Sequence, residues 1–290
     1  MSPRPSPGSE YILTLTCPDR PGLVHAVTGF LLGFEANILA SQQFDDRLTG
    51  HFFMRVHFVI QGAPTGLEEL RAAFTPVAGT YAMDFNLVDV ATPTRTLIMV
   101  SKFGHCLNDL LFRTQVGTLN IDIAAIVSNH PDFEPLAATY GIPFHHIPVT
   151  ADTKPAAEDK LLQLVADEGV NLVVLARYMQ VLSPLASRAL SGRAINIHHS
   201  FLPSFKGAKP YHQAHERGVK LIGATAHYIN DDLDEGPIIE QDVVRVDHYL
   251  DPEELVAAGR DVETQVLSRA VKWHCEQRVM PNGGKTVVFR

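Results

Sequence analysis

Apolar and polar positions divide the first ninety residues into six short elements. Residues 11–16 alternate as a half-buried strand does, and the turn at residues 17–22 ends that strand. Apolar residues at helical spacing then begin at Leu23. The later pattern predicts a strand, a strand, a helix and a strand over residues 37–44, 51–60, 66–74 and 83–90. This β-α-β-β-α-β order is typical of the ferredoxin-like plan.

Beyond residue 94, apolar runs alternate with helical patterns as far as the C-terminus. This alternation predicts an α/β domain with a doubly wound, mostly parallel, Rossmann-like sheet. Asp251-Pro-Glu-Glu254 supplies a helix cap, a first-turn proline and a glutamate three residues after the cap, so a long helix is expected to about Cys275. We expect the following limits: tail 1–9, first domain 10–90, linker 91–94 and second domain 95–290. Strands are predicted at 96–100, 122–127, 144–149, 172–175, 194–197, 222–229 and 239–246, and shorter helices at 106–114, 133–140, 156–168 and 184–190.

Candidate chemistry lies where one of these strands ends. Asn196 and His198 are two residues apart on a strand, so their side chains project to the same side. A second apolar run ends in an acidic turn that contains Asp234. An amide, an imidazole and a carboxylate are the groups needed to attack a carbonyl without a covalent intermediate.

Composition narrows the classes of partner and compartment. Acidic side chains outnumber basic ones by 32 to 24 and no Lys/Arg block occurs, which disfavours nucleic acid and anionic membranes as partners. No apolar span approaches the ~20 residues that a transmembrane helix needs. The first residues lack the apolar core of a signal peptide, so we expect a cytoplasmic protein. Three widely spaced cysteines make a disulfide framework improbable, and Cys106 is expected to be a small buried side chain.

Several motifs carry a resemblance to known families. Asn196-x-His198, the loop at residues 200–207, and Asp234-x-Gly236-Pro237 with Gln241 resemble the folate-dependent formyltransferase superfamily. The doubled histidine and residues 207–214 and 223–228 resemble its deformylase branch, and the likeness extends from Arg95 to the C-terminus. In the first domain, the hexapeptide Asp19-Arg-Pro-Gly-Leu-Val24 and the element order resemble the ACT domain, a small-molecule sensing module.

The deformylase resemblance implies hydrolysis of 10-formyltetrahydrofolate to formate and tetrahydrofolate, which balances one-carbon pools and supplies formate for purine synthesis. The folate is then the substrate, and no cofactor is expected. By this resemblance Asp234 and His198 activate a water molecule, while Asn196 and the imidazolium of His198 hold the oxyanion. Water is favoured over an amine acceptor because residues 101–109 contain one glycine and cannot form the glycine-rich phosphate cradle of the related transferases.

The same resemblance implies two binding sites. Relatives often carry Arg where this chain has Gln180, so Arg177 is a candidate to hold the folate tail instead. An ACT domain implies an amino-acid effector such as glycine or methionine, and a homo-oligomer, either a dimer or a tetramer. The expected folate contacts are Leu175, Met179, Gln180, Val181, Leu182, His199, Asp232 and Gly236, and the expected effector contacts are Asp19, Arg20, Gly22 and Leu23.

Two other functions stay open at this point: formyl transfer to an amine acceptor, and non-catalytic sensing of an amino acid and a folate. A metal site is not predicted, because the histidines at 199, 212, 215 and 227 match no HExxH or related metallohydrolase arrangement. We expect His227 to make a local hydrogen bond that positions its neighbours.

Overall fold

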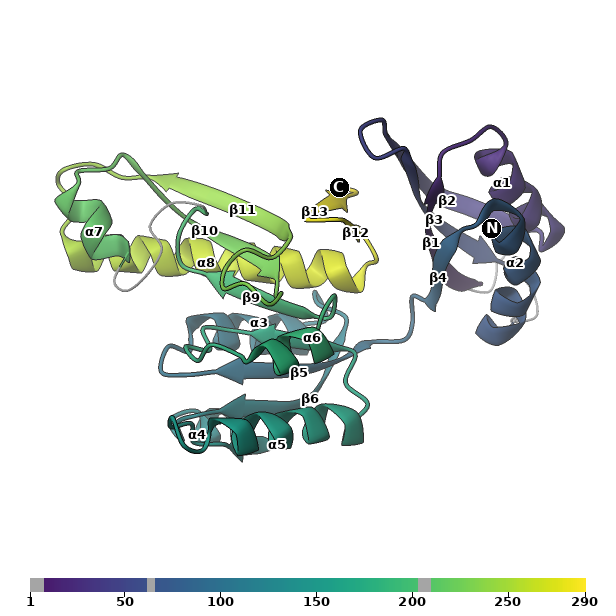
Figure 1. The fold of residues 1–290 in the computed structure, drawn as a ribbon. Coiled ribbons are helices and arrows are strands. Elements are labelled where there is room, and N and C mark those ends of the chain that lie inside the picture. The colour runs from purple at the N-terminus through teal and green to yellow at the C-terminus, as the bar shows by residue number, and fades with distance from the viewer. Residues whose placement is uncertain (1–7, 62–65, 203–209) are drawn as a thin grey trace, which may run out of the picture. The chain divides into compact units, whose positions relative to one another are not determined.

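The computed structural model describes residues 8–61, 66–202 and 210–290 (Figure 1). Contacts divide the chain into two compact units. The first contains the described residues up to Pro93 together with Glu276–Met280 and Val287–Arg290, and the second contains Thr94–Cys275 and Pro281–Thr286. The domain limits predicted from the sequence, 10–90 and 95–290, remain a proposal. None of the described helices is long and apolar enough to cross a membrane.

The first unit contains an antiparallel four-stranded sheet in the order β2-β3-β1-β4. Alternate residues of its first strand, Tyr11, Leu13 and Leu15, are buried in one core with residues of both helices. This is the predicted ferredoxin-like plan. The elements are β1 (Ser9–Pro18), α1 (Leu23–Gly33), β2 (Ala36–Asp46), β3 (His51–Ile60), α2 (Leu67–Tyr81) and β4 (Asp84–Asp89).

Helix α2 extends further than the sequence pattern predicts. The expected helix ended at residue 74, but α2 continues to Tyr81 and includes Pro76 in its interior. Phe74 and Ala78, one turn apart, are both buried in the core of this unit. We attribute the continued helix to this packing, which offsets the backbone hydrogen bond that proline cannot donate.

The second unit contains a seven-stranded sheet in the order β11-β10-β9-β8-β5-β6-β7. The pairs of β5 with β6, β5 with β8, β6 with β7 and β8 with β9 are parallel, whereas β10 is antiparallel to both of its neighbours. The predicted mostly parallel sheet is thus confirmed. Its strands are β5 (Thr94–Val100), β6 (Ile121–Ser128), β7 (Phe144–His146), β8 (Leu172–Leu175), β9 (Ala194–His198), β10 (Leu221–Tyr228) and β11 (Ile238–Arg245).

The long C-terminal helix begins as the sequence predicts. The backbone N–H of Glu254 donates to Asp251 Oδ1 and the N–H of Asp251 donates to Glu254 Oε2, each at 2.8 Å, which is a capping box. The inward side chains Leu255, Val262 and Val266 are buried. The helices of this unit are α3 (His105–Gln115), α4 (Glu134–Thr139), α5 (Lys154–Asp167), α6 (Pro184–Ala189), α7 (Pro210–Glu216) and α8 (Pro252–Cys275).

Three features differ from the expected elements. Strand β7 ends at His146, whereas the apolar run predicted a strand to residue 149. The short helix α7 and a two-stranded sheet of β12 (Val279–Asn282) and β13 (Lys285–Val288) were not predicted. Each is too short for a clear period in the sequence.

The order of the strands determines where the site lies. Since β5 is flanked by β6 and β8, the winding of the sheet reverses direction beside β5, and ligands bind such sheets beyond the carboxyl ends of the strands. Asn196 on β9 is paired with Leu175 on one side and with His227 on the other. Leu175 at the end of β8, Asn196 on β9 and His227 on β10 are therefore neighbours across the sheet, and His198 ends β9 beside them.

Candidate active site

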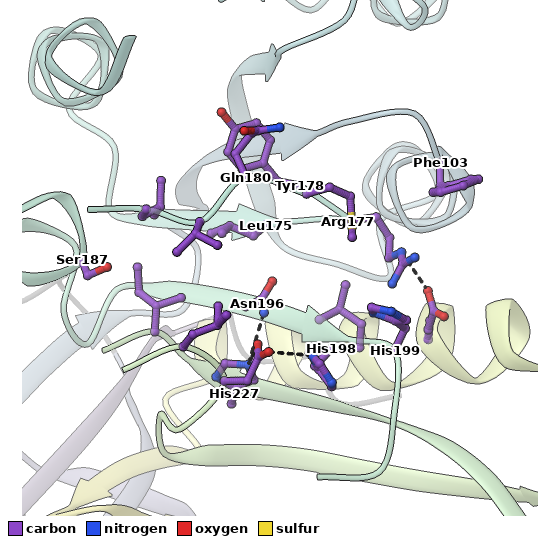
Figure 2. Close-up of a pocket in the computed structure, with 18 of the residues that line it drawn as sticks. Phe103, Leu175, Arg177, Tyr178, Gln180, Ser187, Asn196, His198, His199 and His227 are labelled. Atoms are coloured by element: carbon purple, nitrogen blue, oxygen red, sulfur yellow. Dashed lines mark hydrogen bonds and ion pairs between the residues drawn. The ribbon is translucent and has the colours of Figure 1, made fainter. Parts of the chain in front are cut away.

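A cavity of about 560 Å³ opens beside the ends of β8 and β9 (Figure 2). Its wall combines the segment after β8, the end of β9, the turn after β10 and one face of α8. The three expected catalytic residues, Asn196, His198 and Asp234, all line it. Their assigned roles stay predictions, but the structure brings the three groups together.

Asp234 stands between two histidines. Its Oδ2 lies 3.2 Å from His198 Nδ1, and its Oδ1 lies 3.7 Å from His227 Nε2. His198 is 5% exposed, and its Nε2 has no hydrogen-bond partner in the described chain. With Nδ1–H donated to the carboxylate, Nε2 of the neutral ring keeps its lone pair for a ligand in the cavity.

The ionisation of Asp234 follows from these contacts. Burial alone raises the pKa of its carboxyl, but the hydrogen bond and the positive charge of His198 lower that pKa well below its ordinary value. A carboxylate that stays ionised is a weak base. It is therefore suited to orienting an imidazole and stabilising its protonated form.

A strained turn holds Asp234 in place. Asp234 has φ +58°, in the left-handed region that aspartate tolerates better than most residues. Two residues later, a Cβ on Gly236 would lie 1.7 Å from the carbonyl oxygen of Tyr228. Only glycine allows this close approach of the turn to β10. Gly236 does not line the cavity, and its expected folate contact stays a prediction.

His227 controls the orientation of the Asn196 amide. His227 Nδ1 lies 2.9 Å from the carbonyl oxygen of Tyr228, an acceptor, so Nδ1 carries the proton and Nε2 accepts. Asn196 Nδ2 lies 3.2 Å from that Nε2 and donates to it. The second N–H of the same amide remains for an oxyanion. The expected positioning role of His227 agrees with this geometry.

The loop that follows His198 is held by one buried hydroxyl. Thr225 Oγ1 donates to the carbonyl oxygen of Ser200 at 3.0 Å and accepts from the N–H of Leu202 at 3.1 Å. Gln241 Nε2 donates to the same hydroxyl at 2.9 Å and to the Leu202 carbonyl at 3.1 Å. This network explains the place of Gln241 in the motif. The next part of the motif loop, residues 203–209, lies outside the described residues.

The expected folate contacts other than Gly236 line the same cavity, with different exposure. Leu175 is 5% exposed, whereas Met179 and Val181 are each about half exposed. Exposed apolar side chains that line a cavity favour contact with a flat apolar ligand. The remaining expected residues in the wall are Gln180, Leu182, His199 and Asp232.

Sequence reasoning missed a buried ionic cluster in the cavity wall. Glu263, 1% exposed in its side chain, accepts hydrogen bonds from His105 Nε2 at 2.8 Å and from the Tyr211 hydroxyl at 2.7 Å. Arg177 Nε lies 3.3 Å from Glu263 Oε2. Burial alone raises the pKa of Glu263, but the His105 hydrogen bond, the Arg177 charge and the Tyr211 hydrogen bond lower it overall. A glutamate on the apolar face of α8 was the available signal.

Cys106 lies beside this cluster, and one potential metal-ligand atom from each of His105, Cys106 and Glu263 lies within 4.8 Å of the other two. Cys106 is buried, as expected, and burial raises the pKa of its thiol. A neutral thiol is a poor ligand, and the nearby Arg177 guanidinium repels a cation. We therefore assign no metal to this group.

The four expected effector residues differ in solvent exposure. Asp19, Arg20 and Gly22 are exposed, and Gly22 has φ +95° where it precedes α1. The Arg20 guanidinium lies over the ring of Tyr81, 4.4 Å from its centroid. Leu23 is 2% exposed in the core, so its side chain supports the fold and does not reach a ligand.

Comparison with known proteins finds matches for both parts of the chain. A formyl transferase family model matches residues 94–271, and an ACT domain model matches residues 11–75. A formyltetrahydrofolate deformylase from Corynebacterium sp. (strain P-1) is 57% identical over 97% of this chain and 98% of its own length.

Solved structures agree with this match. The crystal structure of a formyltetrahydrofolate deformylase from Burkholderia mallei superposes with a TM-score of 0.93 at 56% identity, covering 97% of this chain and all of that one. A glycinamide ribonucleotide transformylase from Symbiobacterium toebii gives a TM-score of 0.66 at 29% identity, covering 71% of this chain and 98% of that one.

Proposed function

The chain belongs to the formyltetrahydrofolate deformylase family, and on that premise we propose that it hydrolyses 10-formyltetrahydrofolate to formate and tetrahydrofolate. One observation carries the chemistry. An ionised Asp234 holds His198 Nδ1, while His198 Nε2 has no partner among the described residues and Asn196 stands on the same strand.

The reaction is an addition followed by an elimination. Asp234 orients the imidazole through Nδ1, and water bound at His198 Nε2 loses a proton to that nitrogen as its oxygen attacks the formyl carbon. The carbonyl oxygen becomes an oxyanion, which the free N–H of Asn196 and the imidazolium of His198 stabilise. The C–N bond then breaks, the imidazolium returns its proton to N10, and formate leaves with one proton released to solvent.

The folate is held by the segment after β8. Exposed Met179 and Val181 pack on the pterin, and backbone groups of this segment bind the edge of its ring. Met179 N–H is already donated to Ser101 Oγ at 2.9 Å, which ties this segment to the end of β5. Residues 175–182 are thereby preorganised for a planar ligand. No cofactor enters this scheme.

We also propose that the first unit binds an amino-acid effector near Asp19, Arg20 and Gly22 and that the protein works as a homo-oligomer. Glycine and methionine are the effectors to test first. We place the reaction in the cytoplasm, where the formate would be available for purine synthesis.

The test is formate release from 10-formyltetrahydrofolate by purified protein with no amine present. Repeated turnover supports hydrolysis, and loss of turnover in both His198→Ala and Asp234→Asn, with tetrahydrofolate binding kept, supports the assigned site. Turnover only when an amine such as glycinamide ribonucleotide is added would establish transfer instead. Folate binding without turnover under either condition would establish a sensor.

A further inference from the structure

The cavity contains two guanidinium groups that the proposed hydrolysis does not use. Arg177 and Arg260 both line it, and both lie over the ring of Phe103, at 5.7 and 5.4 Å from the ring centroid. Figure 2 shows Arg177, Phe103 and His199 on the same side of His198, with Ser187 on the opposite side. The side of the cavity toward Arg177 therefore carries positive charge close to the reacting group.

Arg177 has donors without a hydrogen-bond acceptor among the described residues. The residue is 9% exposed, yet its Nε and Nη1 have no hydrogen-bond partner in the described chain. Nε lies 3.3 Å from Glu263 Oε2, an ion pair that does not meet hydrogen-bond geometry, whereas Nη1 has neither kind of contact among the described residues. Buried charged donors without acceptors are costly, so an acceptor supplied by a ligand stabilises this arrangement.

The backbone also holds Arg177 in an unfavourable conformation. Its φ is +65°, and its carbonyl oxygen accepts from the N–H of Ser101 at 3.3 Å. A strained backbone conformation persists only where the surrounding structure stabilises it, and such residues cluster at functional sites. Three donors, His105, Tyr211 and Arg177, share the charge of Glu263, so Glu263 does not saturate the guanidinium.

We propose that Arg177 forms a carboxylate subsite that receives formate after the C–N bond breaks; this inference rests on the proposed function. Formate is a planar anion with two oxygens, and adjacent guanidinium N–H groups match such an anion in a bidentate manner. His199, whose ring centroid is 5.1 Å from that of His198, lies between the reacting group and this subsite.

The electrostatics around His199 agree with an anion site. The pKa of His199 is lowered to about 4, first by burial and then by the positive charges of Arg177 and His198. The opposing effect of Glu263 is smaller. A neutral His199 beside a net positive field can donate to formate without becoming charged.

The experiment titrates ¹³C-formate into folate-free protein and follows line broadening by NMR. Arg177→Met should weaken formate binding by at least ~10-fold, because a charge-assisted hydrogen bond is lost. The exposed Arg260→Ala should weaken it by a smaller factor. Arg188→Met is the matched control, because Arg188 pairs with Asp231 at 3.1 Å and does not line the cavity. Its formate affinity should equal that of the wild type.

Inhibition by added formate, measured through tetrahydrofolate formation, should weaken in parallel with binding. If Arg177→Met does not fold, Arg177→Lys replaces it, because lysine keeps the positive charge but lacks the two parallel N–H donors of a guanidinium. An unchanged formate affinity in Arg177→Lys would overturn the proposal. So would equal formate affinity in wild type and Arg177→Met.

The carboxylate could instead come from the glutamate tail of the substrate. In that case Arg177→Met would raise KM for the glutamate-bearing substrate, but not for 10-formyltetrahydropteroate, and would leave formate binding unchanged. That result would overturn the formate assignment. A third outcome is a wild type that releases no formate from substrate and still binds formate in a way that depends on Arg177. That result would support the formate subsite and refute the proposed hydrolysis.

Discussion

The interaction between Asp234 and His198 offers the sharpest test of the proposed chemistry. Replacing Asp234 by asparagine removes one negative charge and keeps the shape of the side chain. Asparagine also tolerates the left-handed backbone at φ +58°, so the turn should survive. The variant therefore separates the charge of the carboxylate from its position.

The magnitude follows from the distance between the two groups. At 3.2 Å and an effective dielectric constant of about 20, a carboxylate and an imidazolium attract each other by about 5 kcal/mol. The imidazolium forms only as water is deprotonated, so this attraction acts in the transition state. Water entering the cavity and relaxation of the amide reduce the effect. We expect kcat to fall by roughly 10²–10⁴-fold, the range of general acid–base contributions.

The assay is the initial rate of tetrahydrofolate formation at saturating substrate, together with the dissociation constant of tetrahydrofolate. Asp231→Asn is the matched control, because Asp231 lines the same cavity but pairs with the exposed Arg188. The control should keep kcat within about threefold. If Asp234→Asn retained more than a third of the wild-type kcat, the reasoning from charge would be refuted.

Three further outcomes follow from the site and from the second unit. Asn196→Ala should lower kcat by roughly 10²–10³-fold and leave tetrahydrofolate affinity within about threefold, and an unchanged kcat would exclude its role as oxyanion donor. Gly236→Ala should lower both the melting temperature and kcat, because its Cβ would lie 1.7 Å from the Tyr228 carbonyl oxygen. Gly192→Ala is the control for backbone strain alone, because Gly192 has a φ of +73° and no atom within 4 Å of an added Cβ. Burial lowers the pKa of His274 to about 4, so the unfolded state binds more protons between pH 6.5 and 4 and stability falls as pH is lowered through that window. The loss from this one group should be about 2 kcal/mol between pH 7 and 5 in denaturant titrations, and His274→Gln should remove that increment; an identical pH dependence in both proteins would contradict the assignment.

Local pattern was sufficient for the order of the longer elements and for two residues of the candidate site, Asn196 and His198. The strand that ends at His198 is continuous in sequence, so a periodicity of two predicted that Asn196 and His198 lie on one side of it. That Asp234 works with His198 was implied by the family resemblance. The cap at Asp251 and Glu254 is likewise a local contact three residues apart. Contacts between residues this close in sequence can be predicted without the tertiary structure.

Tertiary structure alone decided the rest of the cavity wall. The cluster combines four residues from elements or loops far apart in the chain, and only Glu263, on the apolar face of α8, is unusual in its own segment; the other three are His105, Arg177 and Tyr211. Their meeting depends on the packing of α3, α7 and α8 at the end of β8, which no short period encodes.

The same distinction applies to two of the predicted site residues. Gly236 and Leu23 belong to motifs, yet one is required for a close backbone approach and the other fills a core. A motif shows that a residue type is needed at a position. Whether its side chain faces a ligand or the protein interior depends on the surrounding fold, because burial and hydrogen bonding are determined by neighbours distant in sequence.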